Sequence, residues 1–168
     1  MHISKKSSNF APDFVSMSEQ NHYIIDLSRL PLGTHRFDIQ LDRDFFESLE
    51  KSEILTGKVA ADVALNLRED DFSLSIAVHG TVDVVCDRCL EPVALEIDDE
   101  QEIWSDDEEL NDQMLNKQMV DLTWLAYEIV SINIPLVHCH QPGGCNPQMD
   151  LLLQNHLCDE PEPDEIIE

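Results

Sequence analysis

Apolar and polar residues alternate through KVAADVALNLREDDFSLSIAVHGTVDVV, residues 58–85, with one polar break, REDD, in the middle. The apolar face consists of Val59, Ala61, Val63, Leu65 and Leu67, then Phe72, Leu74, Ile76, Val78, Val82 and Val84. A period of two residues is typical of a strand with one buried face, and a short polar turn joins antiparallel neighbours. The stretch therefore predicts two strands of an antiparallel meander.

Both flanks extend this pattern. Val93, Leu95 and Ile97 alternate with polar or small residues and predict a third strand, while HYIIDLSRLPLG and THRFDIQL predict two strands upstream. Asp42 stands where a helix cap belongs, before RDFFESLEKS. The sequence predicts an α+β fold, in which an antiparallel meander carries one or two helices packed on one face.

Two further helices are indicated near the C-terminus. Asp121 is a candidate cap for a helix whose apolar residues, Leu122, Leu125, Ala126 and Ile129, recur at helical spacing, and Pro135 ends the segment. NPQMDLLLQNHL predicts a last short helix with Asn146 as its cap.

The length of 168 residues and a hydrophobic content of 42% suit one domain with one modest core. We expect a flexible leader over residues 1–20, a single domain over 21–157 and an acidic tail over 158–168. Within the domain, residues 98–118 are expected to form an acidic flexible loop, because nine acids fall between Asp98 and Asp112.

Negative charge is concentrated in the second half of the chain. From Cys89 onward there are 20 Asp and Glu against one base, Lys117, which gives −19 of the total −25. Such a surface repels phosphate and attracts basic proteins. The acidic run at Asp106, Asp107, Glu108 and Glu109 is either a solvated loop or a docking strip for a basic partner.

The sequence predicts a cytoplasmic protein that does not enter a membrane. It contains no run of about eighteen apolar residues, as a membrane-spanning helix would need. The N-terminal MHISKKSSNFAPDF has two lysines without a following apolar segment, unlike a secretory signal. Five cysteines in such a protein are expected to be thiols or metal ligands rather than disulfides.

Two cysteine pairs offer three interpretations. Cys86 and Cys89 are separated by two residues in VVCDRCLEPV, and Cys139 and Cys145 by five residues in HCHQPGGC. Four thiolates can hold zinc tetrahedrally, and this candidate set is Cys86, Cys89, Cys139 and Cys145. Alternatively, Cys86 continues the apolar phase of its strand as a buried thiol, or the first pair is a redox pair.

Nothing in the sequence argues for an enzyme. It has no G-x-S-x-G, no phosphate-binding glycine loop and no H-E-x-x-H. A redox C-x2-C opens a helix after a strand, whereas this pair is expected between two strands. His138 and His140 flank Cys139 and are either exposed loop residues, which their residue type favours, or substitute ligands.

The order of these features resembles the bacterial YceD-like family, whose name refers to accumulation of large-subunit ribosomal RNA. The resemblance runs from about Tyr23 to Cys145. Its most specific element is CDRCLEPV, with Cys86, Arg88, Cys89 and Glu91, and the second is Asp121 with a helix that ends at Pro135.

This resemblance implies a non-enzymatic role in large-subunit ribosomal RNA processing or ribosome biogenesis. Because the chain is so acidic, we expect contact with ribosomal RNA to be indirect, through a basic ribosomal protein, nuclease or assembly factor. The alternatives are a small structural zinc-binding module, which is compatible with the first role, and a thiol- or metal-dependent enzyme.

Overall fold

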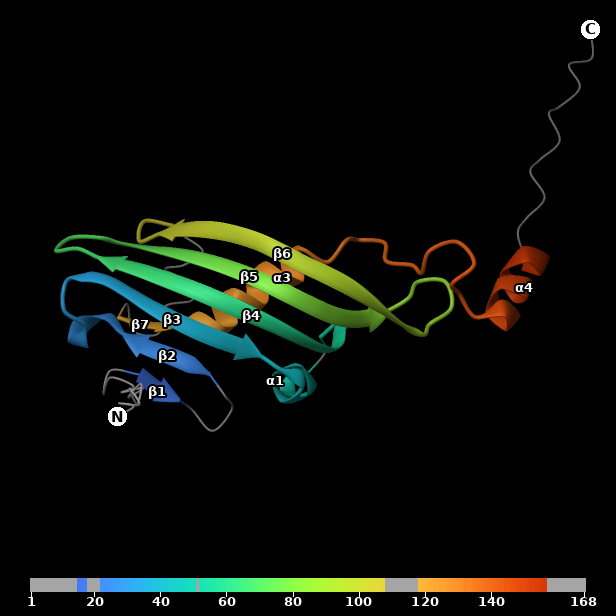
Figure 1. Ribbon diagram of the computed structural model, residues 1–168, viewed down its shortest axis with the longest axis horizontal. Coiled ribbons are helices and arrows are strands. Elements are labelled where there is room, and N and C mark those ends of the chain that lie inside the picture. The colour runs from blue at the N-terminus through green and yellow to red at the C-terminus, as the bar shows by residue number, and fades with distance from the viewer. Residues whose placement is uncertain (1–14, 18–21, 51, 108–117, 157–168) are drawn as a thin grey trace, which may run out of the picture.

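The computed structural model describes residues 15–17, 22–50, 52–107 and 118–156 (Figure 1). Four long strands form one antiparallel sheet in chain order: β3 (Gly33–Leu41), β4 (Ile54–Leu67), β5 (Phe72–Val85) and β6 (Pro92–Trp104). The register pairs Leu65 with Leu74 and Val82 with Leu95, so the apolar positions of neighbouring strands share one face. The predicted meander and the α+β class are confirmed.

A smaller antiparallel sheet has the order β1-β2-β7 and contains β1 (Val15–Met17), β2 (Tyr23–Asp26) and β7 (Met119–Asp121). A short 3-10 helix, η1 (Leu27–Arg29), follows β2. Strand β1 lies inside the segment 1–20 that was expected to be a flexible leader, so that expectation is wrong for residues 15–17. The strand is three residues long and is defined by pairing with β2, a contact that alternation within the segment does not reveal.

The predicted caps begin the helices. Asp42 accepts a hydrogen bond from the Phe45 amide at 3.1 Å and starts α1 (Arg43–Ser48). Asp121 accepts from the Trp124 amide at 3.0 Å and starts α3 (Leu122–Ile132). Helix α4 (Pro147–His156) follows Asn146, whose side chain accepts a hydrogen bond from the Gln148 amide at 3.0 Å. Among the described helices, none is long and apolar enough to cross a membrane.

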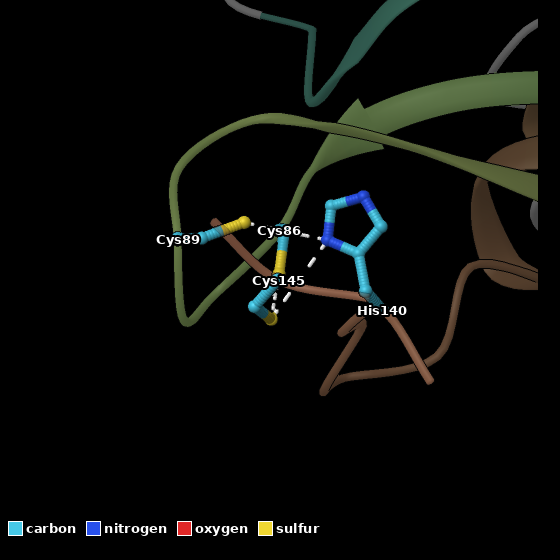
Figure 2. Close-up of side chains that lie close together, drawn as sticks. All are labelled: Cys86, Cys89, His140 and Cys145. Carbon is cyan, nitrogen blue, oxygen red and sulfur yellow. Dashed lines mark hydrogen bonds between the residues drawn. The ribbon is translucent and has the colours of Figure 1, made fainter. Parts of the chain in front are cut away.

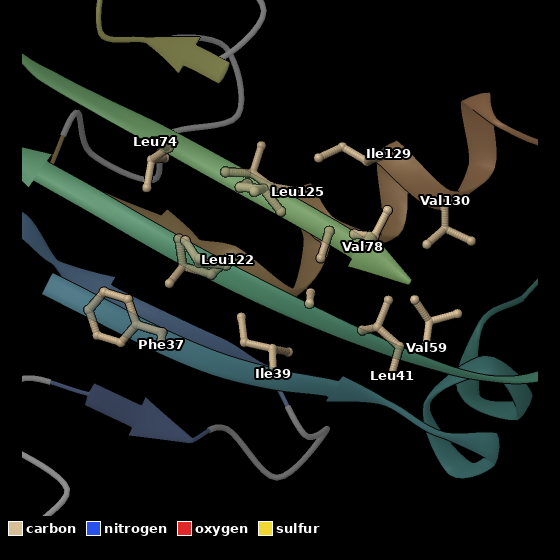
Figure 3. Packing of buried hydrophobic residues seen from close by; sticks show 14 of the residues in the cluster. Phe37, Ile39, Leu41, Val59, Leu74, Val78, Leu122, Leu125, Ile129 and Val130 are labelled. Atoms are coloured by element: carbon tan, nitrogen blue, oxygen red, sulfur yellow. The ribbon is translucent and has the colours of Figure 1, made fainter. Parts of the chain in front are cut away.

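The core lies between α3 and the inner face of the long sheet (Figure 3). Leu122, Leu125, Ala126 and Ile129 of α3 are all at most 5% exposed. Burying a large aliphatic side chain contributes about 1.5–3 kcal/mol relative to leaving it exposed. An 11-residue helix is marginal alone, so this packing is what holds α3 in place.

Strand β6 continues to Trp104, although residues 98–118 were expected to form an acidic loop. The expectation is wrong for residues 98–104, because the alternation continues there: Asp98, Glu100 and Glu102 lie on the exposed side, whereas Asp99 lies on the side of Ile97. Ile97 is buried and Ile103 packs against the core, while Glu100 and Glu102 are exposed. Residues 108–117 and the tail 158–168 lie outside the described residues.

Gly80 lies where two strands approach too closely for any side chain. A Cβ atom there would lie 2.2 Å from the Lys58 carbonyl oxygen and 2.6 Å from the Val59 Cα atom. Since both are backbone atoms of β4, the strand itself would have to move. We expect Gly80→Ala to lower the free energy of unfolding by about 2–3 kcal/mol, measured by denaturant titration. Thr81→Ala, at the exposed neighbouring position, is the control and should change it little. Equal stability of the two variants would contradict this close approach.

Candidate metal centre

The turn between β5 and β6 is tight and carries the first cysteine pair. The Cys86 amide donates to the Glu91 carbonyl at 2.9 Å, and the Leu90 amide donates to the Cys86 carbonyl at 3.0 Å. Leu90 has a φ of 63°, the left-handed conformation that usually favours glycine. This closed turn brings the Cys89 side chain back beside Cys86, and both side chains are buried.

The segment after α3 runs along the sheet to this same turn (Figure 1). Two hydrogen bonds fix it there: the Asp87 amide donates to the His138 carbonyl at 3.0 Å, and the His138 amide donates to the Asp87 side chain at 2.8 Å. Further along, Asn146 donates to the Glu91 side chain at 2.7 Å. Residues between these contacts are therefore held against the turn, and α4 begins at its edge.

Cys86, Cys89, His140 and Cys145 meet at this junction, with one donor atom from each lying within 4.8 Å of all the others (Figure 2). The Sγ atoms of Cys86 and Cys145 are 3.9 Å apart. The His140 Nδ1 atom is 3.3 Å from the Cys89 Sγ atom and 3.9 Å from the Cys145 Sγ atom. In a tetrahedral zinc site, sulfur–sulfur separations are about 3.8 Å and sulfur–nitrogen separations about 3.6 Å. The four donors therefore fit zinc.

The histidine is oriented as a ligand. Its Nε2 atom lies 3.0 Å from the Pro92 carbonyl oxygen, which can only accept a hydrogen bond. Nε2 therefore carries the hydrogen, and the lone pair of Nδ1 faces the sulfur atoms. A metal-binding histidine commonly donates its other ring N–H to a carbonyl in this way, which fixes both tautomer and ring orientation.

The thiols do not ionise alike. Burial alone would raise the pKa of Cys86, but hydrogen bonds from the backbone amides of Cys89, His140 and Arg88 lower it to about 5. Burial, together with hydrogen bonds and charge from Cys86 and Cys89, raises the pKa of Cys145 to about 11. A hydrogen bond with Cys86 raises the pKa of His140. Since several thiolates repel one another at this distance, a divalent cation would stabilise the fully ionised group.

The centre differs from the predicted set of four cysteines in one residue. Cys86, Cys89 and Cys145 come together as expected, but His140 takes the place of Cys139 in the group. Cys139 is partly buried beside it, and burial, followed by the charge of Cys86, raises the pKa of its thiol. The Cys139 thiol hydrogen-bonds Cys86, but it does not belong to the set of donor atoms that all lie within 4.8 Å of one another. The spacing in the sequence favours His140 as the ligand, because four residues separate it from Cys145, which is within the usual range for zinc ligands.

The other predicted motif residues support this junction or the helix behind it. Arg88 contributes a backbone amide to Cys86, and Glu91 binds Asn146. Asp121 caps α3, and Pro135 lies just beyond the end of that helix.

Of the four acids predicted to bind a partner, two fall within the described residues. Asp106 and Asp107 are exposed directly after β6, and the Asp107 side chain accepts from the Trp104 amide at 3.1 Å. Glu108 and Glu109 lie outside the described residues.

A meander crossed by one helix and closed at one end by a Cys3His group defines a small α+β domain with a candidate structural metal centre. The chain belongs to the YceD family: the family model described as "Large ribosomal RNA subunit accumulation protein YceD" matches residues 74–165, more than half of the chain. The match includes all four members of the metal-binding group and confirms the resemblance found in the sequence. No curated protein and no solved structure matches the chain.

Proposed function

We propose that this protein is a non-enzymatic factor in accumulation or processing of large-subunit ribosomal RNA in the cytoplasm. It acts by docking a basic protein, such as a ribosomal protein, a nuclease or an assembly factor, and reaches the RNA through that partner. The role in ribosomal RNA comes from the family description. The observation that carries the mechanism is the charge of −19 from Cys89 onward.

The described surface supports a protein partner rather than direct RNA contact. Glu96, Asp98, Glu100 and Glu102 along β6 are exposed, and Asp106 and Asp107 continue the series. A phosphate contact normally requires a Lys or Arg that displaces a counterion, which this half of the chain hardly offers. Acidic surfaces accelerate association with basic partners and lose that effect as salt rises.

Affinity capture from cells tests this proposal, with protein and RNA both identified and with or without nuclease treatment. We expect a basic protein to remain after nuclease treatment, while ribosomal RNA is lost. Neutralising Asp106, Asp107, Glu108 and Glu109 together should slow association with that partner more than it alters folding.

The matched control neutralises four acids of the first half, Glu50, Glu53, Glu69 and Asp70, all exposed. It removes the same charge and should retain the partner. Loss of every protein after nuclease treatment, with RNA retained on untreated protein, would contradict indirect docking.

The second candidate function is a structural zinc module, and it is compatible with the first. Three sulfurs and one imidazole nitrogen in tetrahedral reach favour zinc over magnesium or calcium, which prefer oxygen ligands. Four protein ligands fill a tetrahedral site, whereas a catalytic zinc keeps one position for water or substrate. Zinc would therefore hold the β5–β6 turn to the segment before α4 rather than catalyse a reaction.

A further inference from the structure

Strand β6 is the last strand in the order of the four-stranded sheet and is hydrogen-bonded to β5 along one edge. It is 13 residues long, and edge strands of this length expose backbone N–H and C=O groups that can pair with another chain. Which residues present these groups follows from the register with β5.

The register runs without a break from Ser73 opposite Trp104 to Val85 opposite Pro92. Just beyond the two ends of this register, the Ser105 amide donates a hydrogen bond to the Phe72 carbonyl, and the Cys86 amide donates one to the Glu91 carbonyl. In an antiparallel ladder, hydrogen-bonded pairs alternate with pairs whose groups point away. Odd-numbered residues of β6 therefore point their backbone groups toward β5, and even-numbered residues point them toward the open edge.

Two independent contacts agree with this assignment and mark the limits of the open stretch. At one end, the outward carbonyl of Pro92 accepts a hydrogen bond from His140 at 3.0 Å. At the other end, the outward amide of Trp104 donates a hydrogen bond to the Asp107 side chain, and the outward carbonyl of Trp104 accepts one from the Asp107 amide. Between them lie five residues whose backbone groups point outward, Ala94, Glu96, Asp98, Glu100 and Glu102, and of these the Glu100 amide also hydrogen-bonds the Asp99 carboxylate.

Four of these five residues are acids, and their side chains are all exposed on the sheet face opposite the core. Successive carboxylates of this set are about 7 Å apart, the repeat of every second residue in a strand. Their register partners on β5 are Thr81, His79, Ala77 and Ser75. Since β5 contains no Lys or Arg, neither of these bases stands opposite the acids, and the Glu100 carboxylate accepts a hydrogen bond from the Ser75 hydroxyl.

We propose that the edge of β6 from Ala94 to Glu102 binds an extended segment of a basic protein as an added strand, with Lys or Arg at every second residue facing the four acids. The acids favour a basic strand as the binding partner. A second copy of β6 would place like charges opposite one another, whereas a basic strand forms opposite-charge pairs. Backbone hydrogen bonds supply affinity in this kind of recognition, and the alternate side chains supply specificity. This inference rests on the proposed function and names the form of its partner.

The test uses full-length protein and two fluorescent peptides of identical composition. In one, lysine and threonine alternate, and in the other the lysines form one block. We expect the alternating peptide to bind at least about tenfold more tightly. N-methylation of one alternate set of its amides, those facing β6, should abolish binding, while N-methylation of the other set should preserve it. Equal binding of the two peptides, or equal effects of the two methylations, would overturn the added-strand proposal.

Protein variants locate the site. Asp98→Pro removes an outward amide and one charge, whereas Asp98→Asn removes the charge alone, so the proline variant should bind the alternating peptide more weakly than the asparagine variant. Pro92 occupies an equivalent outward position in the natural strand. If Asp98→Pro does not fold, the methylated peptides still decide the question.

Failures of the two proposals are distinguishable. Equal binding of both peptides together with capture of a basic protein from cells would overturn the added strand and leave the proposed function standing. Selective binding of the alternating peptide, with no protein captured from cells, would support the added strand and contradict the proposed function.

Discussion

Cys86→Ser protein should bind no zinc under conditions in which the wild-type protein binds one ion per chain. Cys86 has the lowered pKa of about 5 and is therefore the group's thiolate at neutral pH, and its sulfur lies 3.9 Å from Cys145. A serine hydroxyl does not ionise in this range and is a poor zinc ligand. Four protein ligands give structural zinc sites about 10–16 kcal/mol of apparent binding free energy in zinc-finger peptides. Removing one ligand should weaken binding enough for a competing chelator to take the metal from the variant but not from the wild-type protein.

The structural consequence should be local. Without the metal, the segment before α4 is held to the β5–β6 turn by a few hydrogen bonds, such as that from the Asp87 amide to the His138 carbonyl. Hydrogen exchange of the Asp87 amide should therefore accelerate in Cys86→Ser and in wild-type protein treated with a chelator. Amides in the middle of β4 and β5 should keep their protection, because the core there is independent of the centre.

Cys139→Ser is the matched control, since this thiol lies beside the group without belonging to it. It should retain one zinc per chain and normal exchange at Asp87, whereas His140→Ala should lose the metal. Retention of stoichiometric zinc in Cys86→Ser, or equal loss in Cys139→Ser, would contradict the assigned ligands.

Purified protein should bind bare large-subunit ribosomal RNA more weakly than about 100 µM at physiological salt, the weak end of ordinary non-specific binding. The second half of the chain repels phosphate, and the bases of the first half are partly occupied. Arg29, Arg43 and Arg68 form ion pairs with nearby acids at 3.3, 2.5 and 2.9 Å. These pairs reduce the positive charge that the first half of the chain can present to phosphate.

A titration of labelled RNA at several salt concentrations measures this directly. The informative variant replaces the N-terminal bases as a group: Lys5, Lys6, Arg29, Arg36, Arg43, Lys51, Lys58 and Arg68. The opposite result would be tight, salt-sensitive binding of RNA by the wild-type protein. If this variant loses that binding and neutralising residues 106–109 leaves it unchanged, the protein contacts RNA directly and indirect docking is contradicted.

Local patterns were sufficient to predict most of the architecture. The alternation through β4 and β5 and the caps Asp42 and Asp121 depend on neighbouring residues, so the sequence reveals them directly. Composition was misleading after Ile97: the run of acids there suggested a loop, although Asp98, Glu100 and Glu102 lie on the exposed side of a continuing strand and Asp99 on the other side. Strand β1 was missed because it depends on pairing with β2.

Three of the four members of the candidate metal centre were in the predicted set of four cysteines, and the fourth, His140, was named only as a possible substitute, because its position depends on long-range contacts. Hydrogen bonds from the His138 amide to Asp87 and between His140 and the Pro92 carbonyl hold the His140 ring with its Nδ1 atom beside the cysteine sulfurs. These contacts join segments about fifty residues apart in sequence, and no local pattern encodes them. The spacing between His140 and Cys145 favoured the histidine, but Cys139 was chosen for the predicted set because four thiolates can hold zinc.

X-ray absorption spectroscopy of the purified full-length protein at the zinc edge tests the metal centre most directly. The structure predicts one zinc per chain with three sulfur neighbours at about 2.3 Å and one nitrogen neighbour at about 2.0–2.1 Å. The imidazole signal should disappear in His140→Ala and persist in Cys139→Ser. A first shell of four sulfurs, or purified protein without stoichiometric metal, would contradict the centre formed by Cys86, Cys89, His140 and Cys145.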